Sequence, residues 1–212
     1  TLDVQYDDGF TAALDGDWRE VEIVVGDKVK ARAQANGVEL SAAQVQQATR
    51  DSIHALMLIR AYRARGHFHA NLDPLGLEAP KSEEDLDPRS YGFGDADMDR
   101  PIFLDRVLGL EFGTLRQILA ILRRTYCQTI GVEFMHISDP AQKRWIQQRL
   151  ESVRSTPAFT AEQKVHILER VTAAEGLERY LHTKYVGQKR FSLEGGETFI
   201  ASMDDVIQRA GA

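Results

Sequence analysis

Apolar residues recur at helical spacing through the middle of the chain, and the clearest example begins at Ser41. Ser41 and Gln44 form the Ser-x-x-Gln pattern of a capping box, in which each side chain bonds the other residue's backbone N–H. The pattern predicts a helix that runs to about Arg65 and ends at Gly66, since glycine is common just past a helix end. Its apolar stripe comprises Val45, Ala48, Ile53, Leu56, Ile59 and Tyr62.

Five more helices are predicted further along the chain. Thr114 fits the cap of the first, and Asp139 followed by Pro140 marks the start of the second. A Thr-x-x-Gln capping box at Thr160 opens the third. The expected helices span residues 114–126, 139–155, 160–172, 173–184 and 198–209.

Three stretches lack this periodicity. Residues 1–40 are acidic and poorly patterned, and we expect an arm or linker there with one short strand at residues 21–25. Residues 67–101 form a long irregular loop, of a kind that is usually functional or lies over another surface, and short helical turns follow at residues 105–110. Residues 131–137 form an extended link. The sequence therefore predicts a mainly helical chain with little sheet.

The composition narrows the functional classes. The chain has 212 residues, of which 43% are hydrophobic and 27% are charged, as in soluble globular proteins. Its formal net charge of −6 argues against nucleic acid as a partner, and no apolar run is long enough to span a membrane. The single cysteine, Cys127, excludes an internal disulfide and is interpreted as a small buried hydrophobic residue.

Two candidate clusters for metal binding are weak. His67 and His69 would share one face of a strand, but no cysteine or further histidine nearby completes a ligand set, so a structural role is favoured. The acidic residues 83–87 lack the alternating oxygen ligands and central glycine of an EF-hand loop and indicate a solvated loop. No metal ligand is therefore assigned.

Arginines gather near the ends of two predicted helices. They could bind phosphate, but cations that complement the helix dipole are the simpler interpretation. Glu175 and Arg179, four residues apart, similarly indicate a surface ion pair. The two groups of arginines are Arg60, Arg63 and Arg65, and Arg123 and Arg124.

The most unusual segment is residues 187–197, with the sequence Gly-Gln-Lys-Arg-Phe-Ser-Leu-Glu-Gly-Gly-Glu. It combines two cations, an aromatic ring, a hydroxyl, carboxylates and glycines between two predicted helices. Gly195 and Gly196 permit a close backbone approach, and Arg190 could clamp a carboxylate or phosphate through its planar guanidinium. The segment is therefore a candidate binding site.

Five ordered segments carry a resemblance to a known family. They include Ile-Arg-Ala-Tyr-Arg-Ala-Arg-Gly-His, Gly-Val-Glu-Phe-Met-His-Ile and Lys-Arg-Phe-Ser-Leu-Glu-Gly-Gly. In this order they resemble the thiamine-diphosphate-dependent decarboxylating component of the 2-oxoglutarate dehydrogenase complex. The resemblance covers nearly everything from about Ser41 to the end, but not the acidic start. The segments are residues 59–77, 125–137, 143–149, 172–181 and 189–196.

The resemblance implies a helical N-terminal region that leads into an α/β thiamine-diphosphate-binding fold, most of which is missing. We accordingly expect residues 1–40 to be an arm or linker, 41–184 a helical N-terminal domain and 185–212 the start of the catalytic domain. The family's metal-binding motif, Gly-Asp-Gly followed by an Asn pair, is absent; the only asparagines are Asn36 and Asn71. The chain is therefore expected to be a fragment that is inactive by itself.

The resemblance also implies a chemistry. Members of the family are homodimers that use thiamine diphosphate and magnesium to decarboxylate 2-oxoglutarate in the tricarboxylic acid cycle. They pass the succinyl group to a lipoyl group of dihydrolipoyl succinyltransferase, in a complex with dihydrolipoyl dehydrogenase. Arg190 matches a family position near cofactor and substrate, which are both anionic; no catalytic residue and no metal ligand carries over. The expected location is the bacterial cytoplasm, or the mitochondrial matrix for a eukaryotic source.

Two alternatives remain open at the level of sequence. A non-catalytic helical binding or scaffold module could share the ancestry; a stop directly after Ala212 would favour it, whereas continuation into a Gly-Asp-Gly segment would favour the enzyme. A close relative could also act outside a complex or use 2-oxoadipate, and the visible residues do not separate these substrates.

Overall fold

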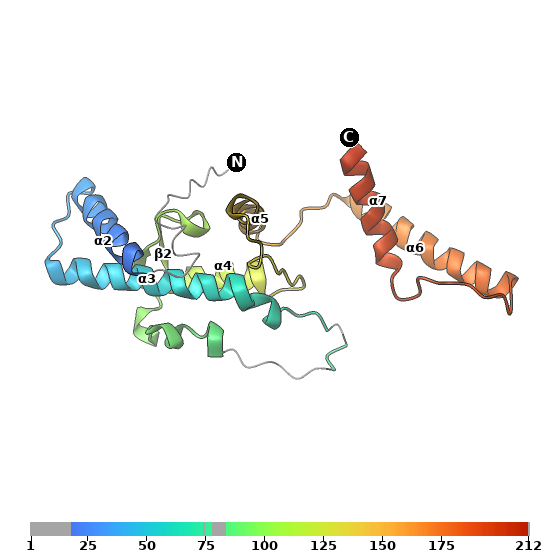
Figure 1. Cartoon of the computed structure of the whole chain (residues 1–212), viewed down its shortest axis with the longest axis horizontal. Coiled ribbons are helices and arrows are strands. Elements are labelled where there is room, and N and C mark those ends of the chain that lie inside the picture. Colours follow the sequence, from blue (N-terminus) through green and yellow to red (C-terminus); the bar gives the residue numbers. More distant parts are fainter. Residues whose placement is uncertain (1–17, 74, 78–83, 212) are drawn as a thin grey trace. The chain divides into compact units, whose positions relative to one another are not determined.

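The computed structural model describes residues 18–73, 75–77 and 84–211 (Figure 1). These residues belong to two compact units, unit 1 up to Thr156 and unit 2 from Pro157 onward. Helices dominate both units, and the described part of unit 1 also contains a two-stranded sheet. The expected mainly helical fold is confirmed.

Unit 1 is built around α3, a long helix that contacts α2, α4 and β1. Helix α2 lies along α3, and α4 and the β-hairpin pack on it as well (Figure 1). The described helices of the unit are α2 (Trp18–Ala35), α3 (Ala42–Arg65), α4 (Leu115–Tyr126) and α5 (Pro140–Val153), and its strands are β1 (Pro101–Phe103) and β2 (Phe112–Thr114).

Helix α2 replaces the strand and much of the linker expected in the first forty residues. Val21, Val25 and Val29 recur every four residues and are all buried in the core. Ile23, which a strand would place on the same face as Val21 and Val25, is 69% exposed. The strand prediction is wrong because burial against α3 overrides the weak β-preference of valine. Residues 1–17 of the expected arm lie outside the described residues.

Helix α3 begins and ends as predicted, but its end has a different cause. Ser41 Oγ accepts the N–H of Gln44 at 3.3 Å, and Gln44 Oε1 accepts the N–H of Ser41 at 2.9 Å. Gly66 keeps a right-handed φ of −56°, so the position does not require left-handed freedom. A Cβ on Gly66 would lie 2.6 Å from the Cβ of Tyr126. Glycine therefore allows α3 and α4 to approach each other closely.

The loop that follows α3 is irregular, as expected, and its described residues include short 3-10 turns. In one of them Asp87 accepts the backbone N–H of Arg89 at 2.9 Å. The turn expected at residues 105–110 is confirmed by η5. The turns are η1 (Gly66–His69), η2 (Glu84–Leu86), η3 (Pro88–Tyr91), η4 (Asp95–Asp97) and η5 (Val107–Gly109).

The hairpin of β1 and β2 has no clear signal in the sequence. Its antiparallel register places Ile102 opposite Gly113 and Phe103 opposite Phe112. Ile102 is buried, and the rings of Phe103 and Phe112 lie 5.3 Å apart. Strands of three residues are too short for an alternating pattern to be recognised.

Helices α4 and α5 start at the predicted caps. Thr114 and Asp139 each accept a backbone N–H from the first turn of the helix that follows. Helix α5 ends at Val153, two residues earlier than expected. It ends there because Arg154 and Ser155 have left-handed φ values of 52° and 47°.

The core of unit 1 includes aromatic rings from α3, from α4 and from the link at residues 131–137. Tyr62, Tyr126 and Phe134 are each 1% exposed. The rings of Tyr126 and Phe134 are stacked, with centroids 6.5 Å apart. The link contains a turn but no strand. Each buried ring contributes about 1.5–3 kcal/mol of hydrophobic stabilisation.

A buried ion pair lies beside these rings and joins three helices. Arg63 donates from Nε to Glu151 Oε1 at 2.7 Å and from Nη2 to Oε2 at 3.1 Å. The Tyr126 hydroxyl donates to the same Oε1 at 2.7 Å. The side chains of Arg63 and Glu151 are 6% and 7% exposed. Burial, and next the carboxylate of Glu151, raises the pKa of Tyr126 well above its ordinary value.

Unit 2 begins with α6 (Ala161–Lys184), a continuous helix of 24 residues. The start at Thr160 is confirmed, since its side chain accepts the N–H of Gln163. The expected division into helices 160–172 and 173–184 is wrong. Proline is absent from α6, and Gly176 at an interior position costs about 1 kcal/mol without ending the helix.

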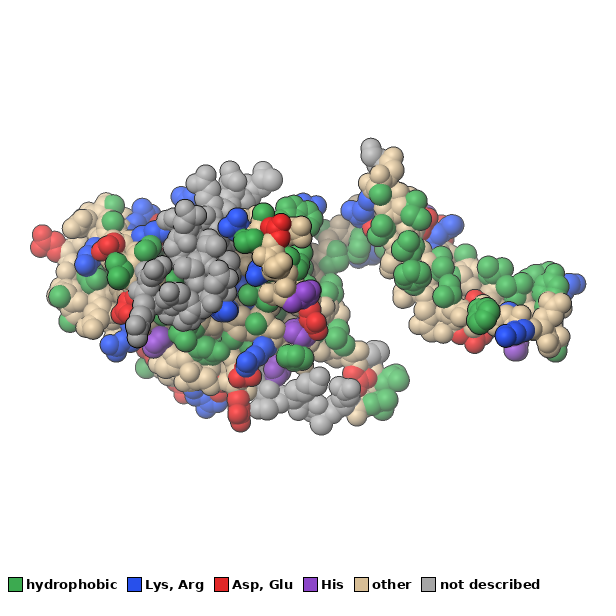
Figure 2. Space-filling view, viewed as in Figure 1, with side chains coloured by type: hydrophobic (Ala, Val, Ile, Leu, Met, Phe, Trp, Pro, Cys, Tyr) green, Lys and Arg blue, Asp and Glu red, His purple; other side chains and the backbone are tan. Residues whose placement is uncertain are grey.

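Helix α7 (Glu197–Gly211) packs along α6 and confirms the last predicted helix. His166 Nε2 on α6 and Asp204 Oδ2 on α7 lie 2.7 Å apart. Both helices also carry exposed apolar side chains (Figure 2). The most exposed of them include Leu168, Leu177, Phe199, Val206 and Ile207.

Two further points concern the chain as a whole. Within the described ranges, no helix is both long and apolar enough to cross a lipid bilayer. The expected domain boundaries at residues 40 and 184 remain predictions, because compact units need not coincide with functional domains.

Candidate functional site

The segment between α6 and α7 folds back along the end of α6. Glu178 Oε1, on α6, accepts the backbone N–H of Leu193 at 3.0 Å. Gly187 and Gly195 have φ values of 80° and 85°, in the left-handed region that other residues rarely adopt. These contacts place Arg190 beside the last turns of α6.

Arg190 lies among three side chains of unit 2. Its Nη2 is 3.3 Å from His182 Nδ1 and 4.0 Å from Glu194 Oε1. Its Nε is 3.9 Å from Glu178 Oε2. The side chain of Arg190 is 26% exposed, so an anion from solvent can reach it. A guanidinium has five N–H donors, and only the contact with His182 is within hydrogen-bond distance among the described residues.

This arrangement suits a carboxylate or phosphate ligand, because a guanidinium binds either through paired, charge-assisted hydrogen bonds. Phe191, next in the chain, is 95% exposed. The structure also brings Arg190 close to Glu178, which the sequence alone places on a surface helix. Glu175 and Arg179 form the expected surface pair at 3.8 Å.

His67 and His69 lie in η1 and not on a strand, so they do not share one face. His67 Nε2 is 3.1 Å from Glu133 Oε1, which gives this histidine a structural contact. His69 lines a small pocket with Cys127, which is partly buried against the core. Within the ranges that the structure describes, no group of three or more His, Cys, Asp or Glu side chains is placed to hold a metal ion.

The arginines near the end of α3 differ in their surroundings. Arg63 lies in the last turn of α3, as the helix-end interpretation expects, and it is also buried in its pair with Glu151. Arg65 pairs with Asp85 of the acidic segment. The carboxylate of Asp85 therefore neutralises the charge of Arg65.

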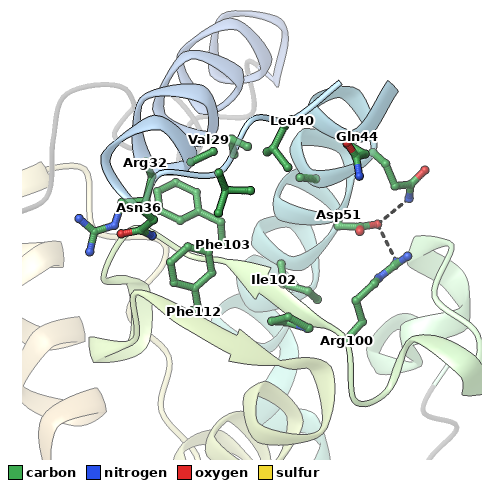
Figure 3. A pocket seen from close by; sticks show the side chains of 15 residues that line it. Val29, Arg32, Asn36, Leu40, Gln44, Asp51, Arg100, Ile102, Phe103 and Phe112 are labelled. Atoms are coloured by element: carbon green, nitrogen blue, oxygen red, sulfur yellow. Dashed lines mark hydrogen bonds and ion pairs between the residues drawn. The ribbon is translucent and has the colours of Figure 1, made fainter. Parts of the chain in front are cut away.

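The described part of unit 1 also contains a pocket of about 380 Å³ between α2, α3 and the hairpin (Figure 3). On one side, Asp51 accepts hydrogen bonds from Gln47 at 2.9 Å and from Arg100 at 3.0 Å. On the other side, Arg32 pairs with Glu111. Both cations that line the pocket are therefore paired with carboxylates. Its apolar lining includes Val29, Leu40, Ile102, Phe103 and Phe112.

Comparison with known proteins decides the ancestry of the chain. No family model matches it. The 2-oxoglutarate dehydrogenase E1 component of Brucella anthropi is 53% identical over 208 residues, which cover 95% of this chain and 21% of that protein. The chain is homologous to part of this E1 component. The E1 components of Brucella ovis and Brucella canis are likewise 53% identical over 207 residues. The chain thus spans about a fifth of the length of these E1 relatives.

The similarity to the E1 components extends further than the sequence motifs indicate. With 95% of 212 residues covered, only about 11 residues lie outside the matched region. Most of the residues before Ser41 must therefore lie inside it, and the expectation that the resemblance stops there is wrong. This agrees with the packing of α2 into the same core as α3.

Proposed function

We propose that this chain is part of a 2-oxoglutarate dehydrogenase E1 component, which decarboxylates 2-oxoglutarate oxidatively and transfers the succinyl group to a lipoyl group. The observation that carries the proposal is the 53% identity over 95% of the chain. Because the chain spans 21% of that relative, the activity would belong to the full-length protein. The chain by itself would be inactive.

Within this function, we assign Arg190 to binding the substrate or the cofactor. 2-Oxoglutarate carries two carboxylates and thiamine diphosphate carries two phosphates, and a guanidinium can bind either kind of group. The partial exposure of Arg190 and the spare donors of its guanidinium support the assignment.

Thiamine diphosphate and magnesium are the cofactors that the proposed function requires. Thiamine diphosphate supplies the electron sink for decarboxylation. Magnesium prefers oxygen ligands in octahedral geometry, including one or two carboxylates, and the described residues provide no cluster of this kind. Arg190 fits an anionic group of the cofactor, while the metal ligands would come from other parts of the full-length protein.

The proposed function also defines partners and a location. A second copy would complete a homodimer, and dihydrolipoyl succinyltransferase and dihydrolipoyl dehydrogenase would complete the complex of the tricarboxylic acid cycle. The relatives come from bacteria, which favours the bacterial cytoplasm over the mitochondrial matrix. A non-catalytic scaffold is less well supported, because these relatives carry the name of the enzyme.

Steady-state kinetics of the full-length protein test this function. The protein, supplied with thiamine diphosphate and magnesium, is offered 2-oxoglutarate or 2-oxoadipate at matched concentrations. We expect a higher kcat/KM for 2-oxoglutarate. If protein that binds thiamine diphosphate turned over neither acid, the proposed function would be rejected.

The variant Arg190→Ala tests the proposed site in the full-length protein. Loss of a charge-assisted contact is expected to lower kcat/KM for 2-oxoglutarate by about 10- to 100-fold. Arg179→Ala is the matched control, since the side chain of Arg179 is 80% exposed on the same helix as Glu178. Equal rates for the wild type and Arg190→Ala would remove Arg190 from the site.

Calorimetric titration of the 212-residue chain with thiamine diphosphate and magnesium tests whether the chain contains a complete cofactor site. We expect no binding, because the chain would contribute only one anion-binding side chain. Clear binding would show that the cofactor site lies within these residues.

A further inference from the structure

A buried donor and a buried acceptor face each other in unit 2 without forming a hydrogen bond. Nε of Arg190 and Oε2 of Glu178 are both shielded from solvent, and neither has a hydrogen-bond partner among the described residues. The two atoms are 3.9 Å apart. A charge-assisted hydrogen bond would bring them about 1 Å closer. Because leaving both atoms unpaired is unfavourable, a small movement that joins them is favoured.

Glu178 is the fixed member of this pair. It belongs to the continuous helix α6, so its backbone is held by helical hydrogen bonds. Its second oxygen, Oε1, is engaged by the backbone N–H of Leu193 at 3.0 Å. Its side chain is only 16% exposed. Arg190 lies in the non-helical segment that follows α6, so it is the member that can move.

The remaining contacts of Arg190 involve its outer nitrogen. Nη2 approaches His182 at 3.3 Å and Glu194 at 4.0 Å, and the side chain of Glu194 is 68% exposed. A bond from Nε to Glu178 would fix the plane of the guanidinium from its inner edge. Both terminal nitrogens would then remain available for an anion on the outer edge.

We propose that Glu178 is the positioning residue for Arg190: its carboxylate pairs with Nε and orients the guanidinium so that the terminal nitrogens bind a carboxylate or phosphate. The inference rests on the proposed function of Arg190. A negative charge beside Arg190 weakens the attraction of an anion, so any gain from Glu178 must come from orientation. The sign of the effect therefore separates positioning from simple electrostatics.

The first test is Glu178→Gln in the full-length protein. The amide keeps an oxygen for the N–H of Leu193 but removes the charge that faces Arg190. Arg190→Ala is expected to raise the KM for 2-oxoglutarate or the KM for thiamine diphosphate. The KM that it raises is the quantity to measure in Glu178→Gln. Positioning predicts that Glu178→Gln raises the same KM by about five- to tenfold, with a smaller change in kcat. An unchanged or lower KM, as loss of a repulsive charge alone would give, overturns the inference.

Glu175→Gln is the matched control, because Glu175 is on the same helix, is 61% exposed and pairs only loosely with Arg179 at 3.8 Å. It should leave that KM unchanged. In an Arg190→Ala background, Glu178→Gln should have no further effect, since its action would pass through Arg190. An equal effect in both backgrounds would overturn the positioning role.

A measurement that does not depend on enzymatic activity tests the contact between Glu178 and Arg190 separately from the assignment of Arg190 to the site. The Nε–H resonance of Arg190, followed by ¹⁵N NMR in the full-length protein, should shift in Glu178→Gln and not in Glu175→Gln. No shift in Glu178→Gln overturns the contact itself. A shift combined with wild-type KM values in both Arg190→Ala and Glu178→Gln rejects the assignment of Arg190 to the site, and with it the positioning role.

Discussion

Gly66 at the end of α3 and Tyr126 at the end of α4 approach so closely that a Cβ on Gly66 would lie 2.6 Å from the Cβ of Tyr126. Gly66 has an ordinary helical φ of −56°, so the space between the helices, and not the backbone conformation, requires a glycine. The same approach places the Tyr126 hydroxyl 2.7 Å from Glu151 of α5. One missing side chain thus helps to set the positions of three helices.

Gly66→Ala is expected to destabilise unit 1 by about 1–3 kcal/mol, because the added methyl group forces the helices apart. Urea unfolding followed by tryptophan fluorescence measures this, since Trp18 and Trp145, the two tryptophans of the chain, both belong to unit 1. Gly26→Ala in α2 is the control. Its Cβ would meet Thr49 Oγ1 at 3.4 Å, an ordinary contact, and should cause no loss. Equal stability of Gly66→Ala and the wild type would contradict this account.

Glu151→Gln is expected to cost unit 1 about 3–5 kcal/mol, because it leaves the charge of Arg63 buried without its anionic partner. The same urea experiment measures the loss. Glu111→Gln is the matched control, since Glu111 is 41% exposed in its pair with Arg32 and exposed pairs contribute less than about 1 kcal/mol. A loss no larger than that of the control would show that the buried pair has little influence on stability.

The raised pKa of Tyr126 predicts that unit 1 loses stability in alkali. Its pKa is raised well above the ordinary value of 10.0, mainly by burial, so the folded protein keeps a proton that the unfolded chain releases. The contribution of Tyr126 is therefore fully present below about pH 10 and is lost as the pH rises toward the folded pKa. The free energy of unfolding in urea should fall between pH 8 and pH 11, and it should fall less for Tyr126→Phe than for the wild type. Identical decreases in variant and wild type would exclude Tyr126 as the cause.

The lowered pKa of Asp204 predicts that unit 2 loses stability in acid. A hydrogen bond with His166 holds the pKa of Asp204 below its ordinary value of 3.8, and Gln208 adds to this effect. Asp204 therefore stabilises the folded state at pH values above its pKa in the unfolded chain. This stabilisation is lost as the pH falls through the lower pKa of the folded state. Carboxyl ¹³C NMR should show that His166→Ala raises the pKa of Asp204 toward 3.8. A pKa that stays unchanged in this variant would mean that His166 does not act on Asp204.

The apolar side chains of α7 predict self-association of the isolated chain. Phe199, Val206 and Ile207 are 58%, 56% and 64% exposed, and exposed apolar surface of this kind favours contact between molecules. Sedimentation velocity should show an average mass that rises with concentration. Replacing Val206 and Ile207 together by glutamate should shift the equilibrium toward monomer. A wild-type chain that stays monomeric and melts cooperatively would contradict the prediction.

Local features of the fold were predictable from the sequence, whereas long-range ones were not. Ser41, Thr114 and Thr160 cap their helices through hydrogen bonds within one turn, so the neighbouring residues carry the full signal. Helix α2 depends instead on burial of Val21 and Val25 against α3, a contact that a local pattern of β-branched residues conceals.

The candidate site shows the same limit. Arg190 was predictable because its segment has an unusual composition and matches a family motif. Its approach to Glu178 was not, because the chain between the two residues leaves α6 and turns at the left-handed Gly187, so their separation follows no regular period. In this part of the chain the sequence showed only the i, i+4 spacing of Glu175 and Arg179, which forms a surface pair outside the site.

The chemistry of the helix starts has a consequence for the behaviour of this chain in acid. Helices α3, α4 and α6 each begin with a hydroxyl paired with a glutamine amide, and neither group changes its charge as the pH falls. Helix α5 begins instead with the side chain of Asp139, whose Oδ1 accepts the N–H of Ala141 at 2.7 Å. Acidification should therefore leave the starts of α3, α4 and α6 intact, so that an acid-denatured chain would retain nuclei from which helices can regrow.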